Sequence, residues 1–390
     1  MRITYIHQHF TLPTESGGTR SWEFARRLAD EGHKVTMISG GAVRRSYREQ
    51  GFDVIQLPVS YSNSMSTVSR ILAFLHFMAS ATRVAVATPT DLVFATSTPL
   101  TVAVPGMVAA TIRRVPFVLE VRDLWPEVPI ALGVLRSKVA KFLALRLEAV
   151  AYARATRIIA LSPGMRDGVL RVRPSAHVTV IPNACDSELF DIPEADRLAF
   201  RQAKNWGTDE LVVVYAGSLG RVYDTEWTVK TAAHLAGADV RFIMIGDGMF
   251  RESCERLAGR LGLDAGALLL GPLSKYETAQ YVASADLALS TSISDPTLNP
   301  ASLNKVFDAL AAGRPILFNH EGWLSDLVSE NQAGWKVSRD PSAAADQIRQ
   351  IAAGNGGILS ARERSKELGK AQFLREDLYV TFRDTLVSAH

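Results

Sequence analysis

The feature that most constrains this fold is an alternation of short apolar runs with amphipathic stretches, which ends near mid-chain and then starts again. In the first half, the predicted strands are residues 2–6, 34–39, 54–58, 92–96, 117–121 and 158–162. The helices predicted between them are residues 20–30, 66–87, 101–113 and 137–155. This alternation favours a parallel sheet that is covered by helices on both faces.

The second half repeats the pattern after a turn-rich segment at residues 183–186. Its predicted strands are residues 211–217, 240–246, 268–271, 287–291 and 315–319, and its predicted helices are residues 224–236, 250–261, 276–283 and 302–312. A chain of 390 residues is long enough for two such domains. We therefore predict an α/β protein in which two Rossmann-like domains face each other across a cleft.

The predicted domain boundaries follow from this pattern. The first domain is expected to span residues 1–183 and the second residues 184–365, and we predict that the charged helix in residues 366–390 packs back on the first domain. Net charge also divides the chain, because residues 1–185 contain 22 Lys and Arg against 12 Asp and Glu, whereas residues 186–390 contain 21 against 28. Opposite signs suggest that the two domains have different partners.

Composition argues against several other classes of protein. The two cysteines, Cys185 and Cys254, have no ligand spacing, which excludes a disulfide framework or a Cys-based zinc site and fits a reducing compartment. Residues 1–7 have the pattern of a first strand, so no signal peptide is expected. The longest apolar candidates for a membrane span, residues 102–112 and 142–153, are interrupted by charges, Pro or Gly. We therefore expect a cytoplasmic protein.

A glycine pair, Gly17 and Gly18, lies after the first strand and just before the helix predicted from Arg20. Glycines there let the backbone approach a ligand, and the free N–H groups of the next helix suit an anion. An ordinary tight turn is the alternative, but His9 and Arg20 border the loop and favour a binding function. The G-x-G-x-x-G spacing is absent, which weighs against a nicotinamide dehydrogenase.

The most informative stretch is the helix predicted within residues 302–315, for which Ser302 is the expected N-cap. Asn304, Lys305 and Asp308 are spaced so that they can share one face. The helix N-terminus and the ammonium of Lys305 suit a diphosphate, and a carboxylate one turn deeper suits vicinal hydroxyls, as on a ribose. A solvated polar face is the alternative for Asn304 and Lys305, but it fits Asp308 less well because the helix is otherwise mostly apolar.

These residues resemble the signature helix of GT-B nucleotide-sugar glycosyltransferases, in particular glycosyltransferase family 4. The resemblance extends in order over nearly the whole chain, through residues 17–18, 122–127, 161–165, 182–186 with 189–190, 216–218 and 245–248. The chain is similar to bacterial enzymes that build polysaccharide or O-antigen repeats, such as N-acetyl-L-fucosamine and colanic acid transferases.

The resemblance implies a hexosyltransferase-type enzyme that retains the configuration of the transferred sugar. The donor would be a nucleotide-diphosphate sugar, with a UDP-sugar favoured over a GDP-sugar. The acceptor would be lipid-linked or a glycan, in the biosynthesis of a bacterial surface polysaccharide such as lipopolysaccharide. No cofactor and no metal are expected, because the sequence shows no Asp-x-Asp at a strand end. The sequence itself shows no nucleophile, so retention rests on the resemblance alone.

Three groups of site residues follow from the motifs and the resemblance together. The expected catalytic residues are Arg122, Asp123 and Lys305. The expected donor-binding residues are Gly17, Gly18, Arg221, Gly246, Asn299, Asn304, Lys305 and Asp308. The expected acceptor-binding residues are His9, Arg20 and Glu127.

The chain departs from the family pattern at the donor sugar. Family members usually carry two glutamates eight positions apart, and the second corresponds to Asp308, whereas the first falls on Pro300. Asn299 or Asp295 could substitute, and the sequence leaves this open. A Lys that is common in relatives after Gly217 is not obvious here, so Arg221 becomes the candidate phosphate ligand beside Lys305.

A second departure concerns the reaction centre. Arg122 occupies a position where relatives often have His, so a catalytic histidine is not inherited. An Arg in the cleft could neutralise a diphosphate, while Asp123 or Glu127 could orient an acceptor hydroxyl. An Arg122–Asp123 pair that merely holds the loop is an equal alternative.

The basic character of the first half is concentrated in a stretch with apolar residues. Residues 132–153 mix four cations with Phe142 and several leucines, which is typical of a helix at a membrane surface or an anionic ligand. A core helix with solvated cations is the alternative. Nucleic acid is disfavoured because the basic groups are dispersed. We therefore expect peripheral contact with an anionic membrane, on the inner face of the plasma membrane, through the first domain.

Two other functions stay open on the same fold. A sugar-nucleotide epimerase or hydrolase would release an isomer or free nucleotide without an acceptor. A non-catalytic sugar-binding protein would need export, which the expected lack of a signal peptide argues against.

Overall fold

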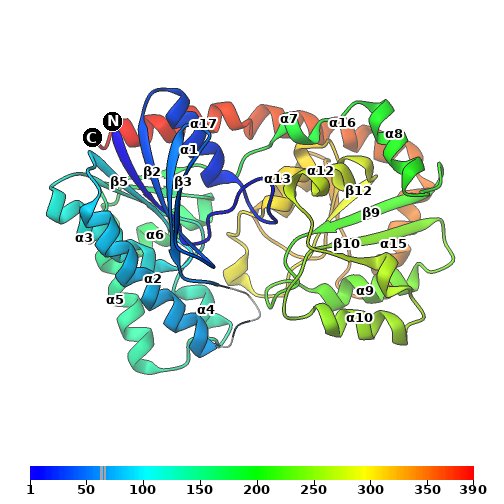
Figure 1. The fold of residues 1–390 in the computed structure, drawn as a ribbon. Helices are drawn as coiled ribbons and strands as arrows, with labels where there is room; N and C mark the ends of the chain where they lie inside the picture. The colour runs from blue at the N-terminus through cyan, green and yellow to red at the C-terminus, as the bar shows by residue number, and fades with distance from the viewer. Residues whose placement is uncertain (62–64, 66) are drawn as a thin grey trace.

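The computed structural model describes residues 1–61, 65 and 67–390, which form two α/β domains side by side (Figure 1). The first domain has an eight-stranded sheet in the order β3-β4-β2-β1-β5-β6-β7-β8. Its strands are β1 (Arg2–Ile6), β2 (Lys34–Gly41), β3 (Arg45–Glu49), β4 (Phe52–Pro58), β5 (Leu92–Thr96), β6 (Phe117–Val121), β7 (Arg157–Ala160) and β8 (Val178–Val180). All neighbouring strands are parallel except β3 and β4, which form an antiparallel edge.

Helices cover both faces of this sheet, as the alternation predicted. They are α1 (Arg20–Asp30), α2 (Thr67–Ala87), the short η1 (Leu100–Val102), α3 (Ala103–Arg113), α4 (Glu127–Ala131), α5 (Lys138–Arg154) and α6 (Pro163–Val172). Helices α2, α3, α5 and α6 share one core with the sheet, whereas α1 packs on the other face. Every residue of β5 and β6 is buried because both faces are covered. Residue 66, the first of the predicted second helix, lies outside the described residues.

The second domain has a six-stranded, fully parallel sheet in the order β11-β10-β9-β12-β13-β14. Its strands are β9 (Leu211–Ala216), β10 (Val240–Ile245), β11 (Leu269–Gly271), β12 (Leu287–Ser290), β13 (Ile316–Phe318) and β14 (Gly334–Lys336). Its helices are α7 (Ser187–Phe190), α8 (Glu194–Ala203), α9 (Thr225–His234), α10 (Arg251–Arg260), α11 (Ala265–Leu268), α12 (Lys275–Ser284), η2 (Pro296–Leu298), α13 (Asn304–Ala311), α14 (Trp323–Glu330), α15 (Pro341–Ala353) and α16 (Asn355–Gln372). The two predicted Rossmann-like domains are thus confirmed.

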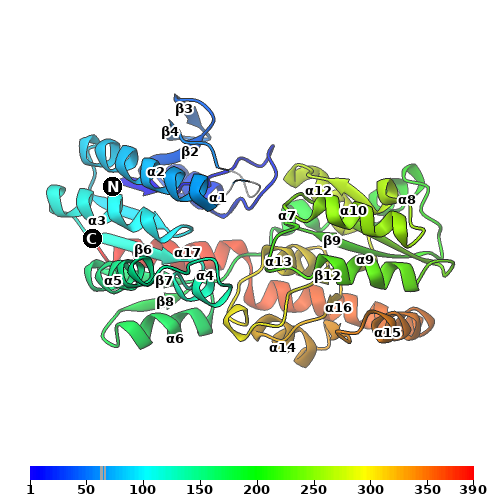
Figure 2. The same cartoon turned by 90° about the horizontal axis from the view of Figure 1, so that it is seen from below.

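The last helix, α17 (Arg375–Val387), returns to the first domain, as predicted (red in Figures 1 and 2). The ring of Phe382 stacks on Phe24 of α1 with centroids 4.3 Å apart and meets Phe94 edge-on at 5.2 Å. Residue 366, the predicted start of this crossing segment, falls inside α16. The helix that crosses back begins only after the bend between α16 and α17.

The sequence pattern missed the elements that carry little apolar periodicity. Strand β3 is mostly exposed and polar, because it lies at the edge of the sheet and pairs on one side only. Strand β14 has three residues, too few for an alternation to be recognised. Neither element lines the main cavity between the domains.

Candidate active site

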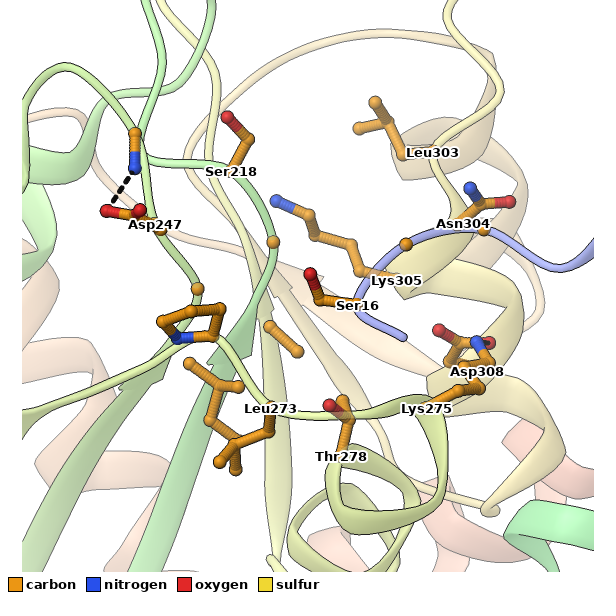
Figure 3. A pocket seen from close by; sticks show the side chains of 18 of the residues that line it. Ser16, Ser218, Asp247, Leu273, Lys275, Thr278, Leu303, Asn304, Lys305 and Asp308 are labelled. Carbon is orange, nitrogen blue, oxygen red and sulfur yellow. Dashed lines mark hydrogen bonds and ion pairs between the residues drawn. The ribbon is translucent and has the colours of Figure 1, made fainter. Parts of the chain in front are cut away.

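A cavity of about 470 Å³ opens between the two domains, within the usual size range of ligand sites. Most of its lining follows the carboxyl ends of parallel strands, where ligands of open α/β sheets generally bind. The lining residues are Ser16, Gly17, Gly18, Ala216, Gly217, Ser218, Tyr223, Ile245, Gly246, Asp247, Gly248, Pro272, Leu273, Lys275, Thr278, Leu303, Asn304, Lys305 and Asp308. The second domain supplies most of this wall, and the first supplies the glycine loop (Figure 3).

Helix α13 begins at the cavity and brings Lys305 into it. The Lys305 Nζ atom is buried and has no hydrogen-bond partner among the described residues. It lies 3.8 Å from the ring centroid of Tyr215 and 4.1 Å from that of Tyr223. Burial lowers the pKa of Lys305 well below its ordinary value. A buried cation held only by aromatic faces leaves its hydrogen-bond donors available to an anion in the cavity.

Asp308 lies one turn further along α13 and forms an ion pair with Lys275 of α12. The Lys275 Nζ atom donates to Asp308 Oδ1 at 2.6 Å, and both side chains are largely buried. Burial raises the pKa of Asp308, and Lys275 opposes this rise. Both residues line the same end of the cavity (Figure 3). The carboxylate can accept hydrogen bonds from hydroxyl groups of a ligand there.

The glycines of the site allow close approach of backbone segments. A Cβ atom on Gly18 would lie 2.7 Å from Nδ2 of Asn304, which belongs to the other domain. A Cβ atom on Gly246 would lie 1.9 Å from the carbonyl oxygen of Gly217, and Gly246 has a φ of +140°. A side chain at Gly246 would therefore clash with the backbone of Gly217, and one at Gly18 would displace the amide of Asn304.

Arg122 and two histidines of the first domain lie beside the glycine loop but are not part of the lining of the main cavity. The Arg122 Nη1 atom lies 3.5 Å from Nε2 of His7, and a Cβ atom on Gly18 would lie 3.9 Å from Arg122 Nη2. Burial, reinforced by Arg122, lowers the pKa of His9 to about 4. His9 is therefore neutral near pH 7, which leaves Arg122 as the cation facing Gly18 and Asn304.

Asp123 lies beside Arg122 and is held by another residue. Its Oδ2 atom accepts a hydrogen bond from Thr98 Oγ1 at 3.0 Å, and burial raises its pKa. No ion pair between Arg122 and Asp123 is present in the described part of the chain. The alternative of a loop-holding Arg122–Asp123 pair therefore lacks support.

Arg20 occupies a different place from the one expected for an acceptor ligand. It is buried, its Nε atom donates to Glu120 Oε1 at 3.0 Å, and its Nη2 atom donates to the carbonyl oxygen of Ile181 at 2.9 Å. It also donates to the carbonyl oxygen of Pro182. The prediction that Arg20 binds an acceptor is wrong, because the domain linker already uses its donors.

Three other predicted ligands lie outside the cavity. Glu127 is partly exposed and pairs with Arg171 at 3.1 Å. Arg221 lines a separate shallow cavity over α9. Asn299 lines two smaller cavities, one of which shares Tyr223 and Leu303 with the main cavity.

The segment with Pro300 contacts the first domain instead of the cavity. Ser162 caps α6 through Met165 N and donates to the carbonyl oxygen of Pro300 at 2.6 Å. Asp295 is used locally, since it accepts hydrogen bonds from the backbone and hydroxyl of Thr297. Neither suggested replacement for the missing glutamate, Asn299 or Asp295, lines the main cavity.

Ser302 is not the cap of the signature helix. Helix α13 begins at Asn304, after Leu303, without a side-chain cap. Ser302 instead contacts the domain linker, where Asn183 Nδ2 donates to the Ser302 carbonyl at 2.7 Å and Asn183 N to Ser302 Oγ at 3.4 Å. The first N–H groups of α13 are therefore not satisfied by a protein cap, which suits an anion-binding helix end.

Sequence reasoning missed several residues that line the cavity. They are Ser16, Tyr223, Asp247, Pro272, Leu273, Lys275, Thr278 and Leu303. Most follow a predicted strand within a few residues, and in a parallel sheet such positions gather at one edge. That rule could have identified Lys275, which follows β11 closely, but it does not show that this side chain pairs with Asp308.

Two family models match the chain in succession. One, described as "Glycosyl transferase 4-like domain", matches residues 17–184, and the other, described as "Glycosyl transferases group 1", matches residues 210–353. Together they cover most of the chain, and each corresponds to one of the two sheets.

Curated relatives match in part. A protein from Pseudomonas aeruginosa described as "Probable glycosyltransferase WbjE" is 28% identical over 244 residues, 60% of this chain and 59% of that protein. A "GDP-mannose-dependent alpha-(1-6)-phosphatidylinositol dimannoside mannosyltransferase" from Mycobacterium tuberculosis is 25% identical over 180 residues, 45% of this chain and 44% of that protein. The matches thus span three fifths or less of these relatives' length.

Solved structures with low identity share the whole fold. Sucrose-phosphate synthase from Thermosynechococcus elongatus has a TM-score of 0.79 at 20% identity, over 100% of both chains. Anabaena Alr3699/HepE in complex with UDP and glucose has a TM-score of 0.73 at 19% identity, over 100% of both chains. With two glycosyltransferase family models in the expected order and this architecture, the chain belongs to the family 4 type of GT-B glycosyltransferases.

Proposed function

We propose that this chain transfers a sugar from a nucleotide-diphosphate donor to a lipid-linked or glycan acceptor in the biosynthesis of a bacterial surface polysaccharide. The observation that carries the proposal is the buried, unpartnered ammonium of Lys305 at the start of α13, with Asp308 one turn deeper in the same cavity. The diphosphate of such a donor is the anion that would bind Lys305, and the adjoining ribose carries the hydroxyls that would bind Asp308. The two groups follow each other in the donor in the same order as the two residues along the helix.

The cavity suggests how the donor lies. Its diphosphate would contact Lys305, the N-terminus of α13 and the backbone near Gly18 and Ser218. The ribose would meet Asp308, and the base would extend toward Leu273 and the neighbouring Pro272 and Thr278 (Figure 3). The sugar would then point to the first domain, where Arg122 lies.

We favour UDP over GDP as the nucleotide. Two solved structures with the same fold are described as complexes of HepE with UDP and with UDP-glucose. A curated relative is described as GDP-mannose-dependent, so GDP is the alternative to be tested. The test is a thermal-shift comparison, in which a nucleotide at 100 times its dissociation constant adds about 2.7 kcal/mol of stability. UDP is expected to raise the melting temperature more than GDP does.

Transfer is proposed to retain the configuration of the sugar. The bond between the anomeric carbon and the diphosphate oxygen breaks, and a bond to the acceptor oxygen forms on the same face. The acceptor proton passes to the departing phosphate oxygen, so the step needs no covalent intermediate with the protein. Lys305 and Arg122 would stabilise the negative charge that develops on the leaving group. Asp123, held by Thr98, would orient the acceptor hydroxyl.

No metal is included in this mechanism, since the helix terminus and the two cations face the diphosphate. We expect EDTA to leave turnover unchanged. A loss of turnover that Mg²⁺ or Mn²⁺ restores would contradict this part of the proposal.

The competing functions differ in their products. A UDP-sugar panel is incubated with the chain, with and without lipid-linked saccharides, and the products are separated by chromatography. The proposal expects free UDP in proportion to glycosylated acceptor, and NMR of the new linkage to show the donor's anomeric configuration. UDP release or an isomerised donor without acceptor would instead indicate a hydrolase or epimerase. Tight donor binding without any product would indicate a non-catalytic binding protein.

We also propose that the protein works in the cytoplasm, at the inner face of the plasma membrane. Support comes from the excess of Lys and Arg in the first domain and from the membrane-associated nature of the proposed acceptors. The excess cations would attract the protein to anionic lipids.

A further inference from the structure

A small pocket adjoins the main cavity beside Lys305. It has a volume of about 30 Å³ and shares Tyr223 and Leu303 with the lining of the main cavity. An interior space of this size holds about one small group, such as a water molecule or a methyl group. The pocket is therefore too small for a ligand of its own, but it can take one substituent of a ligand that occupies the main cavity.

The pocket lies next to the cation that binds the diphosphate in the proposed function, on which this inference rests. The ring centroid of Tyr223 is 4.1 Å from Nζ of Lys305, and Leu303 precedes Lys305 by two residues at the start of α13 (Figure 3). The sugar of a nucleotide-diphosphate donor is bonded directly to the second phosphate, whereas the nucleoside is proposed to lie toward Asp308. The sugar is therefore the part of the donor that can place a substituent in this pocket.

The walls of the pocket are mostly apolar and carry no charge. The described residues that line it include no Asp, Glu, Lys or Arg. Burial lowers the pKa of His320, which also lines the pocket, to about 4, so this histidine is neutral near pH 7. The aliphatic side chains of the lining are Val222, Leu298, Ala301, Leu303 and Leu324.

Two polar side chains of the lining are already engaged within the protein. Ser292 Oγ donates to the carbonyl oxygen of Val222 at 3.0 Å. His320 Nδ1 lies 2.9 Å from the carbonyl oxygen of Glu321, so it carries the ring proton and donates it, while Nε2 accepts from Ser290 Oγ at 3.1 Å. Neither side chain therefore has a ring nitrogen or hydroxyl proton left for a ligand in the pocket.

The backbone of Ala301 is satisfied as well. Its N–H group donates to the carbonyl oxygen of Leu298 at 2.9 Å, and its carbonyl oxygen accepts from Trp323 Nε1 at 2.9 Å. A hydroxyl group or a water molecule in the pocket would thus find few hydrogen-bond partners, and a buried polar group without partners is unfavourable. A methyl group needs no such partner.

We infer that this pocket selects the donor sugar, and that the sugar places a methyl group in it, as a 6-deoxyhexose or an acetamido sugar does. Both classes present the same chemistry to the pocket, an apolar group of matching size. The loop that lines the pocket has Pro300 where family members usually carry a glutamate, and the Pro300 carbonyl accepts from Ser162 Oγ at 2.6 Å. On either side of Pro300, Leu298 and Ala301 line the pocket with apolar groups instead of a carboxylate.

The test measures the affinity of the full chain for paired UDP-sugars by calorimetry, without acceptor. UDP-glucose is compared with UDP-6-deoxyglucose and with UDP-N-acetylglucosamine, and UDP-galactose with its 6-deoxy and N-acetyl counterparts. Wild type is expected to bind a methyl-bearing donor of one series about tenfold more tightly than the parent, because one methyl group in an apolar pocket is worth about that much. A gain for the 6-deoxy sugar alone assigns the pocket to the methyl group on C6, and a gain for the acetamido sugar alone assigns it to the acetyl methyl group. If GDP binds instead of UDP, GDP-6-deoxymannose is compared with GDP-mannose.

Two variants connect this preference to the pocket. Ala301→Leu fills the pocket and is expected to abolish the preference, while its affinity for UDP, which does not reach the pocket, stays as in wild type. Leu298→Ser should reduce the preference by about fivefold, because the new hydroxyl group gives the parent sugar a hydrogen-bond partner. Leu198→Ser, at an exposed position on α8, is the matched control and should keep the wild-type preference. If Ala301→Leu binds UDP and keeps the full preference, the pocket does not select the sugar.

The outcomes separate this inference from the proposed function. If the nucleotide binds and no methyl-bearing donor is preferred to its parent, the inference is wrong and the proposed function stands. If neither UDP nor GDP binds, alone or with a sugar attached, the proposed function is wrong and the inference is overturned with it.

Discussion

Arg20 in the first domain and Lys305 in the second both end in a buried charged group, and they differ in what surrounds that group. Arg20 meets the carboxylate of Glu120 and two backbone carbonyls of the domain linker. Glu120 is in turn satisfied by Thr96, whose hydroxyl donates to it at 2.6 Å. Lys305 has two tyrosine rings and no hydrogen-bond partner among the described residues.

The comparison shows that the partners of a buried charged group indicate its role. Burying a charge is unfavourable unless hydrogen bonds and an opposite charge replace water. Arg20 has this compensation within the protein, which indicates a structural role in joining sheet and linker. Lys305 lacks it, and such an arrangement persists most readily where a ligand completes it. Both residues had been predicted to bind a substrate, and only the surroundings separate them.

The largest expected effect is on stability at Arg20. Arg20→Leu leaves Glu120 buried without its cation and frees two linker carbonyls, so the first domain should lose about 3–5 kcal/mol of unfolding free energy. Urea unfolding followed by circular dichroism measures this. Adding Glu120→Leu should recover part of the loss, because the unpaired charge is removed. If Arg20→Leu alone is as stable as wild type, Arg20 does not have the structural role inferred here.

Lys305 should show the opposite pattern. Lys305→Met is expected to lower kcat/KM for the donor by about 10²–10³-fold, because the leaving diphosphate loses a buried cation. Its melting temperature without ligand should equal or exceed that of wild type, since a buried amino group without a hydrogen-bond partner is gone. Lys230→Met, at an exposed site of the same domain, serves as control for the loss of a positive charge. If Lys305→Met is less stable than wild type and has normal turnover, Lys305 has a structural role and does not bind the donor.

Asp308 sharpens the comparison within the donor site. Asp308→Asn should weaken UDP binding by about 10–100-fold, since hydrogen bonds to a charged acceptor are worth about 1.5–3 kcal/mol. Affinity for inorganic diphosphate should hardly change, because the carboxylate is proposed to contact ribose. Calorimetry measures both ligands. An equal loss of affinity for both ligands would show that Asp308 does not contact the ribose. Asp346→Asn, which removes a carboxylate from an exposed ion pair with Arg349, is the control for the change in net charge.

The smallest effect concerns pH and follows from the lowered pKa of Lys305. Between that lowered pKa and the ordinary value of 10.5, the unfolded chain binds more protons at this site than the folded chain. The contribution of Lys305 to stability therefore rises with pH across this window. UDP binding needs the ammonium, so it should take up a proton and weaken as pH rises.

Calorimetry in buffers of different ionisation enthalpy measures this proton uptake. Tyr223 and His320 titrate elsewhere, since burial raises the pKa of Tyr223 to about 12 and lowers that of His320 to about 4. The uptake should disappear in Lys305→Met. If wild type binds UDP without net proton uptake near neutral pH, Lys305 is already charged in the free protein.

Much of the donor site could be predicted because its residues belong to continuous motifs. Asn304, Lys305 and Asp308 are placed by helical spacing alone, and Gly17 and Gly18 by their position after the first strand. Both groups line the same cavity because carboxyl ends of parallel strands meet at one edge of each sheet. Lys275 and Tyr223 were not predicted because the role of each depends on a residue distant in sequence. Lys275 pairs with Asp308, and the ring of Tyr223 contacts Lys305.

By itself, the sequence determined the two-domain α/β architecture and the positions of the helix ends and glycine loops in the cleft, since periodicity and turn residues are local properties. Only the tertiary structure decided which polar residues remain available to a ligand. Arg20 is engaged by a carboxylate 100 residues away, and the loop with Pro300 turns to Ser162 of the other domain. Likewise, only the fold shows that Val222, Leu298 and Leu324 meet around one small apolar pocket. Whether a donor, a charge or an apolar face is already satisfied depends on partners that chain folding brings close, and no local pattern records them.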